Sequence, residues 1–136
     1  MDENTLQMAK YWFEKAKKSL KTAKYEFNRK NIDFCVNRLY YAAFYAVSAL
    51  LIVKGKSYKK HSAVRIALHR DFVKTGLIPV KYGKLYDALL RDREEADYVA
   101  FVDFDKGVIK EELIETMHFI NIFESLLQEE IKEKKK

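Results

Sequence analysis

Hydrophobic residues recur at alternating steps of three and four near the start of the chain, the spacing of one face of an α-helix. The repeating positions are Leu6, Ala9, Phe13, Ala16, Leu20, Ala23 and Phe27, and lysines fill the other faces. This pattern predicts a long amphipathic helix over about residues 4–29. A second helix is predicted from Ile32 to about Lys54, with Asn31 and Asp33 as candidate caps and Gly55 as its end.

The second predicted helix is apolar on nearly every side over its last four turns. A helix of this kind is surrounded by protein, so we expect it to be the central element of a helical bundle. Its longest uncharged run, Leu39–Val53, has fifteen residues. A membrane span needs about twenty. We therefore expect a buried helix and no membrane association.

Three further helices are predicted downstream. One begins at His61 or Ser62, carries Val64, Leu68 and Phe72 on one face and ends at Gly76. The next covers about residues 81–97, with Leu85, Leu89 and Leu90 facing inward. The last covers about residues 106–132, with the stripe Ile109, Leu113, Met117, Ile120, Phe123, Leu127 and Ile131. Residues 98–105 are a loop or a bent extension, and residues 131–136 are expected to be a frayed, lysine-rich tail.

These elements predict one all-α domain over residues 1–136, an up-and-down bundle of four to five helices. Composition agrees, because four glycines and one proline are too few for an all-β sandwich and form no glycine-rich phosphate loop. A single cysteine excludes a disulfide framework and a cysteine-based zinc site. The N-terminal residues lack the layout of a signal peptide, so a cytoplasmic location is expected.

Charge is distributed unevenly along the chain, whose net charge is +6. Residues 1–90 carry a net +11 and residues 91–136 a net −5. A basic region of this size attracts nucleic acid or phosphate ligands. Solvation of helix surfaces by Lys and Glu explains the same charges without any ligand.

Few side chains suggest chemistry on their own. The three histidines are too scattered in the sequence for a metal site, and no metal or cofactor is expected. Cys35, in the first turn of the second helix, is expected to be a core residue. Three polar clusters stand out instead, at residues 37–44, 58–62 and 91–98.

The first cluster places Asn37 and Arg38 at the start of the most apolar helix. Positions 37, 41, 44 and 48 share one face there, so Asn37 lies beside Tyr41 and needs a polar partner. The arginine-rich end of the fourth helix is the best source of one. The second cluster is a basic loop that opens a helix, with Lys60 and His61, and such a loop can bind phosphate.

The third cluster contains Arg91, Arg93, Asp97 and Tyr98. The predicted ligand-binding site combines the three clusters: Asn37, Arg38, Tyr41, Lys60, His61, Arg91, Arg93, Asp97 and Tyr98. Arginines bind phosphate and tyrosines stack on bases, so the expected ligand is a nucleotide or RNA. A structural network that joins two helices is the alternative, and it includes helical ion pairs of Arg91 with Glu95 and of Arg93 with Asp97.

Four sequence segments in this order resemble the HEPN domain family: NRLYYAAFYAVSALL, KKHSAV, FVKTG and RDREEADY. The likeness is greatest to its small stand-alone branch, whose members occur beside minimal nucleotidyltransferases. The resemblance implies an all-α homodimer that binds nucleotide or RNA and partners a nucleotidyltransferase in a toxin–antitoxin or defence module. Many members are metal-independent ribonucleases, and some carry an adenylated tyrosine near the position of Tyr98.

The family's ribonuclease signature is an arginine followed, after four to six residues, by a histidine. The histidine handles the proton of the RNA 2′-hydroxyl, and the arginine stabilises the charged phosphorane. Here Arg93 is followed by no such histidine. The alternatives are therefore a ribonuclease that uses Arg93 with Asp97 or with a histidine from elsewhere, and a non-catalytic helical adaptor.

Overall fold

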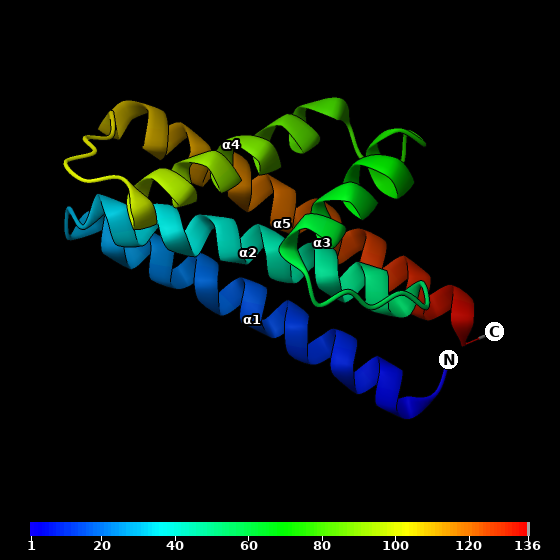
Figure 1. The fold of residues 1–136 in the computed structure, drawn as a ribbon. Coiled ribbons are helices and arrows are strands. Elements are labelled where there is room, and N and C mark those ends of the chain that lie inside the picture. The colour runs from blue at the N-terminus through cyan, green and yellow to red at the C-terminus, as the bar shows by residue number, and fades with distance from the viewer. Residues whose placement is uncertain (136) are drawn as a thin grey trace.

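The structure is a computed structural model that describes residues 1–135 and contains five α-helices and one π-helical segment (Figure 1). In chain order they are α1 (Glu3–Asn28), α2 (Ile32–Val53), α3 (His61–Ala67), the π-helical η1 (Leu68–Val73), α4 (Val80–Tyr98) and α5 (Lys106–Lys134). Residues 1–135 contain no β-strand. The predicted all-α fold is confirmed.

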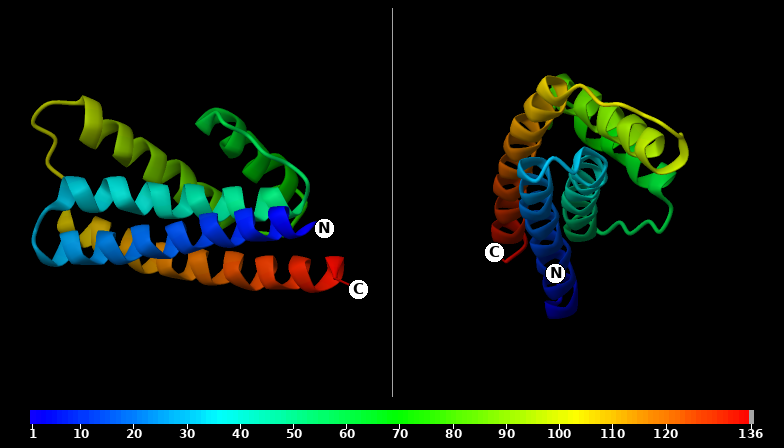
Figure 2. Two further views of the ribbon diagram at one scale, coloured as in Figure 1. Left: turned by 90° about the horizontal axis from the view of Figure 1, so that it is seen from below. Right: turned by 90° about the vertical axis from the view of Figure 1, so that its left-hand side faces the viewer.

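The four long helices alternate in direction, and α1 and α4 cover different sides of α2 (Figures 1 and 2). The N- and C-terminal ends lie at one end of the bundle, and the α1–α2 and α4–α5 connections lie at the other (Figure 2). The short α3 and η1 lie over the C-terminal half of α2, beside the start of α4 (Figure 1). This arrangement brings α3 and α4 to the same side of α2.

The central helix is α2, as expected, because it packs against α1, α3, α4 and α5. Most of its residues are buried, from Ile32 to Val53. Among the described helices, α2 alone is long and apolar enough to cross a bilayer by length and composition. Its burial inside the bundle accounts for that composition, because a core helix is apolar on every side.

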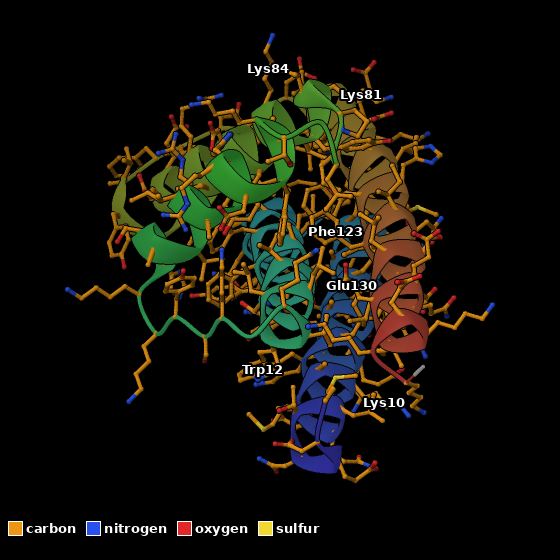
Figure 3. All side chains as sticks on the ribbon, turned by 90° about the vertical axis from the view of Figure 1, so that its right-hand side faces the viewer. Lys10, Trp12, Lys81, Lys84, Phe123 and Glu130 are labelled. Atoms are coloured by element: carbon orange, nitrogen blue, oxygen red, sulfur yellow. The ribbon has the colours of Figure 1, made fainter. Side chains whose placement is uncertain are left out.

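The inward faces agree with the sequence pattern in α1 and α3 and differ in α4. The buried residues of α4 are Tyr82, Gly83, Tyr86 and Leu89, whereas Leu85 and Leu90 are only half-buried. The tyrosines define this face because they are large and pack edge-to-face on aromatic residues of α2 and α5. On α5, Phe123 points into the core beside Phe119, with ring centroids 4.5 Å apart (Figure 3).

Several predicted helix ends are wrong in detail. The side chain of Asn31 does not cap α2, because its Nδ2 donates a hydrogen bond to Glu26 instead. The tail expected to fray is helical as far as Lys134, where the chain continues the regular pattern of α5. Lys136 lies outside the described residues. Side chains of Asp2 and Asp105 cap α1 and α5.

The third predicted helix changes from α to π geometry after Ala67, and it ends at Val73. The backbone N–H of Lys74 donates to the carbonyl of His69, the five-residue step of a π-helix. This segment packs against α4 at Gly83, where a Cβ would lie 2.9 Å from His69 Cε1. Only glycine lets the two helices approach so closely.

Candidate functional site

Arg93 anchors a polar and aromatic cluster where α4 crosses α2. Its Nε donates a hydrogen bond to Asp97 Oδ2 at 3.2 Å, one helical turn further along α4. Its guanidinium carbon lies 5.4 Å from the ring centroids of both Tyr40 and Tyr41 on α2. The side chain is only 17% exposed, so its charge is held in a fixed position rather than moving in solvent.

Asn37 connects this cluster to the first turns of α2. Its Nδ2 donates to the Asp97 carboxylate at 3.3 and 3.4 Å, and its Oδ1 accepts hydrogen bonds from Arg38 Nε and Nη2. The Arg38 guanidinium lies 4.9 Å from the centroid of the Tyr41 ring. Asn37 thus finds its partner at the end of the fourth helix, as expected, and the partner is a carboxylate rather than an arginine.

His61, the first residue of α3, completes the cluster. Its ring stacks on Phe44 with centroids 4.2 Å apart, and its Nδ1 lies 2.9 Å from Tyr40 Oη. Burial, and then the positive charge of Arg93, lowers the pKa of His61 below its ordinary value of 6.5. The imidazole is therefore neutral at pH 7 and keeps one ring nitrogen for a ligand.

The cluster borders a hollow of about 440 Å³ between α2, α3 and α4. Its lining residues are Tyr41, His61, Ser62, Arg65, Ile66, Leu90, Arg93 and Glu94. A volume of this size is typical of ligand pockets, which start at about 300 Å³. The hollow therefore offers two arginines, one neutral histidine and one tyrosine to the same ligand, and one carboxylate, that of Glu94, also lines it.

A model of the HEPN domain family matches residues 9–133. The chain belongs to the HEPN domain family. It is 37% identical to the UPF0332 protein of Thermotoga maritima, over 90% of this chain and 93% of that protein. Two proteins of Methanocaldococcus jannaschii, each named a putative toxin, are 38% and 36% identical over 68% and 61% of this chain. Those two matches span 63% and 62% of the relatives' own length.

For this HEPN chain, the histidine beside Arg93 comes from α3 and not from the residues that follow the arginine. The site predicted from the sequence includes His61 but does not pair it with Arg93. The available signal was the KKHSAV segment, which opens a helix directly after the central one. Its partnership with Arg93 depends on how α3 and α4 pack on α2, which residue spacing does not reveal.

Three predicted site residues do not join the cluster. Arg91 is exposed, and its charge acts on Glu112 of α5 rather than on the hollow. Lys60 is exposed at the start of α3 and makes no side-chain hydrogen bond within residues 1–135. Tyr98, the last residue of α4, is 76% exposed. Of the two predicted ion pairs, that of Arg93 with Asp97 forms, and none joins Arg91 to Glu95 in the described chain.

A second polar group, which sequence reasoning did not combine, lies next to this hollow. Asp87 of α4 accepts hydrogen bonds from Arg65 Nε at 2.7 Å and from His69 Nε2 at 3.0 Å. Burial alone would raise the pKa of Asp87, but these two hydrogen bonds and the neighbouring charges hold it below its ordinary value. The carboxylate thereby fixes Arg65 at the rim of the hollow and joins α3 and η1 to α4.

Proposed function

We propose that this HEPN protein binds single-stranded RNA, with a backbone phosphate held by Arg93 in the hollow between α2, α3 and α4. The observation that carries the proposal is a nearly buried arginine beside a neutral histidine in one hollow. Within residues 1–135, the two Nη groups of Arg93 have no hydrogen-bond partner. The Nη groups of a guanidinium can donate two parallel hydrogen bonds to two oxygens of one phosphate.

The neighbouring groups support a nucleic-acid ligand. Tyr41 and the neutral His61 ring offer aromatic surfaces beside the phosphate position. Bases of single-stranded RNA stack on rings of this kind. The net charge of +11 over residues 1–90 attracts the polyanion from a distance.

The binding test compares two arginines on the same helix. Arg93→Ala is expected to weaken binding of a labelled single-stranded RNA about tenfold or more, because a charge-assisted hydrogen bond contributes about 1.5–3 kcal/mol. Arg91→Ala removes the same charge from the exposed face of α4 and is the matched control. We expect it to change affinity only slightly, since salt screens a distant exposed charge. Fluorescence anisotropy measures both variants.

Thermal unfolding of the same proteins separates binding from stability. Arg93 also pairs with Asp97 and packs on two tyrosines, so a modest fall in melting temperature is expected. A large loss of stability with unchanged RNA affinity would assign the cluster to a structural network between α2 and α4.

The relatives' names and the resemblance to the small HEPN branch support a cellular role as the toxin of a two-protein module. We propose that its partner is a nucleotidyltransferase. Such an enzyme can join adenylate from ATP to the exposed Tyr98 hydroxyl and release pyrophosphate. Incubation with a nucleotidyltransferase encoded beside this chain and ATP should add one adenylate mass, and Tyr98→Phe should prevent it. An unchanged mass for the wild-type chain contradicts this partnership.

Cleavage of the bound RNA is a second candidate function, favoured by the position of His61 beside Arg93. A neutral imidazole can take the proton of the 2′-hydroxyl, whose oxygen then attacks phosphorus. The P–O bond to the 5′-oxygen breaks, and this oxygen takes up a proton from water. Arg93 would stabilise the charge on the phosphorane, and the products would be a 2′,3′-cyclic phosphate and a 5′-hydroxyl.

His61→Asn tests this chemistry. We expect the variant to bind RNA within a few-fold of wild type and to lose cleavage by about a hundredfold or more. Because the pKa of His61 is lowered, the wild-type rate should rise with pH below neutrality and level off by pH 7. If the RNA stays intact after long incubation with the wild-type protein, the cleavage hypothesis is wrong and RNA binding alone is retained.

A further inference from the structure

A second hollow of about 330 Å³ lies between α1, α2 and the connection from α2 to α3. Its lining residues include Trp12, Phe44, Ser48, Tyr58, Lys59 and His61. His61 lines this hollow and also the Arg93 hollow. The two hollows are therefore neighbours that share the His61 side chain.

Aromatic, aliphatic and polar side chains together line the second hollow. Trp12 projects from α1 on the side of the connection that leads into α3 (Figure 3). Phe44 lies in the α2 wall under the stacked His61 ring, and Tyr58 belongs to the connection. Ser48 and Ser57 add hydroxyl groups that can donate or accept hydrogen bonds. A flat, partly polar ring can stack on these aromatic side chains and reach the two hydroxyl groups.

The charge around this hollow selects an anionic ligand. Residues 54–70 contain six cationic side chains, four lysines and two arginines, and no Asp or Glu. Of the two lysines that line the hollow, Lys56 pairs with Asp71 at 2.8 Å. Lys59 is exposed and forms no ion pair within residues 1–135. Lys15 lies 5.1 Å from the Trp12 ring centroid, beside the same surface. A planar group attached to a phosphate chain satisfies both the aromatic walls and this rim.

We propose that the second hollow receives a nucleobase of the RNA strand whose phosphate binds Arg93. This inference rests on the proposed function and adds a base-binding subsite to it. In a single strand, bases alternate with phosphates along the chain. A strand that passes His61 can therefore place a phosphate on the Arg93 side and a base on the Trp12 side. Base stacking on aromatic rings tolerates every base, so the subsite adds affinity with little sequence preference.

Trp12 is the one tryptophan of the chain, so its fluorescence reports this hollow directly. Titration with an adenylate RNA octamer should quench the emission because a base stacks against the indole. An abasic octamer of equal charge should bind more weakly and leave the emission unchanged. AMP should quench only at much higher concentration, since it lacks the extended backbone. Equal affinity for AMP and the octamer would overturn the strand subsite.

A substitution that fills the second hollow tests the base subsite through its effect on RNA affinity. Ser48→Leu adds bulk to the α2 wall, and we expect octamer affinity to fall about fivefold to a hundredfold, with quenching lost. Ser125→Leu makes the same change at an exposed position of α5 and should have no effect. If Ser48→Leu fails to fold, as judged by circular dichroism, Tyr58→Ala removes one aromatic wall from the connection and should weaken quenching.

The outcomes separate this inference from the proposed function. One possible result is that octamer binding depends on Arg93, is unaffected by Ser48→Leu and Tyr58→Ala, and leaves the Trp12 emission unquenched. This result would overturn the base subsite and leave phosphate binding by Arg93 intact. Octamer binding that depends on neither Arg93 nor the second hollow would overturn both.

Discussion

The carboxyl groups of Asp92 and Glu112 face each other between α4 and α5, and neither lines the Arg93 hollow. Burial, followed by the adjacent Asp92 carboxyl, raises the pKa of Glu112 to about 8. The positive charge of Arg91 opposes this shift only in part. One proton therefore stays on this pair in the folded chain at neutral pH, because two neighbouring carboxylates repel each other.

This proton makes stability depend on pH. Between about pH 4.5, where an unfolded glutamate ionises, and about pH 8, the folded chain binds more protons than the unfolded one. The free energy of unfolding should therefore fall as pH rises through this window. Glu112→Gln should remove most of that fall and stabilise the protein at alkaline pH by about 1–2 kcal/mol, a value reduced for solvent screening.

Urea unfolding on both sides of this window measures the effect. Glu111→Gln is the control, since its side chain is an exposed neighbour on α5. If wild type and Glu112→Gln showed the same pH dependence, the carboxyl pair would have no role in it.

At the scale of elements, the contact between η1 and α4 positions the rim of the binding hollow. Gly83 lets His69 approach α4, and Asp87 then holds both His69 and Arg65. A Cβ on residue 83 would lie 2.9 Å from His69 Cε1 and 3.1 Å from Val73 Cγ2. The first distance requires the His69 ring to shift, and the second is tighter than an ordinary contact, so the hydrogen bond of His69 to Asp87 would be strained.

Gly83→Ala should therefore destabilise the protein by about 1–3 kcal/mol, although alanine favours helices more than glycine does. The same substitution should cost less in a His69→Ala background, because the nearest obstructing atoms are then absent. Denaturant unfolding of wild type, the two single variants and the double variant measures the cost of Gly83→Ala in both backgrounds. Equal costs in both backgrounds would show that His69 is not the neighbour that makes glycine necessary.

At the scale of the whole molecule, one end of the bundle exposes large apolar side chains. Phe34 lies in the first turn of α2 there, and Val99 and Phe101 come directly after α4. Phe101 is fully exposed and has a positive φ of 60°, which is uncommon for a bulky residue. Exposed apolar patches mark interaction surfaces. We propose that two copies of the chain pair through this patch.

Light scattering at tens of micromolar protein should then give twice the mass of one chain. Replacing Val99 and Phe101 together with serine should produce monomers without loss of helicity, because neither side chain lies in the core. Val80→Ser is the control, since Val80 is equally exposed at the opposite end of α4. A monomeric wild-type protein, or a dimer that survives the double substitution, would contradict this interface.

The amino-acid sequence by itself determined the helices and the central position of α2, because hydrophobic periodicity is a local property of the chain. It also identified the face of α2 that carries Asn37, Tyr41, Phe44 and Ser48. These side chains lie at or beside the two hollows. The face stands out because it is polar at one end of an otherwise apolar helix.

Only the tertiary structure decided which of the remaining polar residues meet at this face. Arg91 and Arg93 are equivalent in a sequence, but two residues along a helix turn the side chain by about 200°, so one faces the hollow and the other faces solvent. His61 joins Arg93 because α3 and α4 pack on the same side of α2. Helix packing depends on contacts between distant residues, and those contacts exist only in the folded chain.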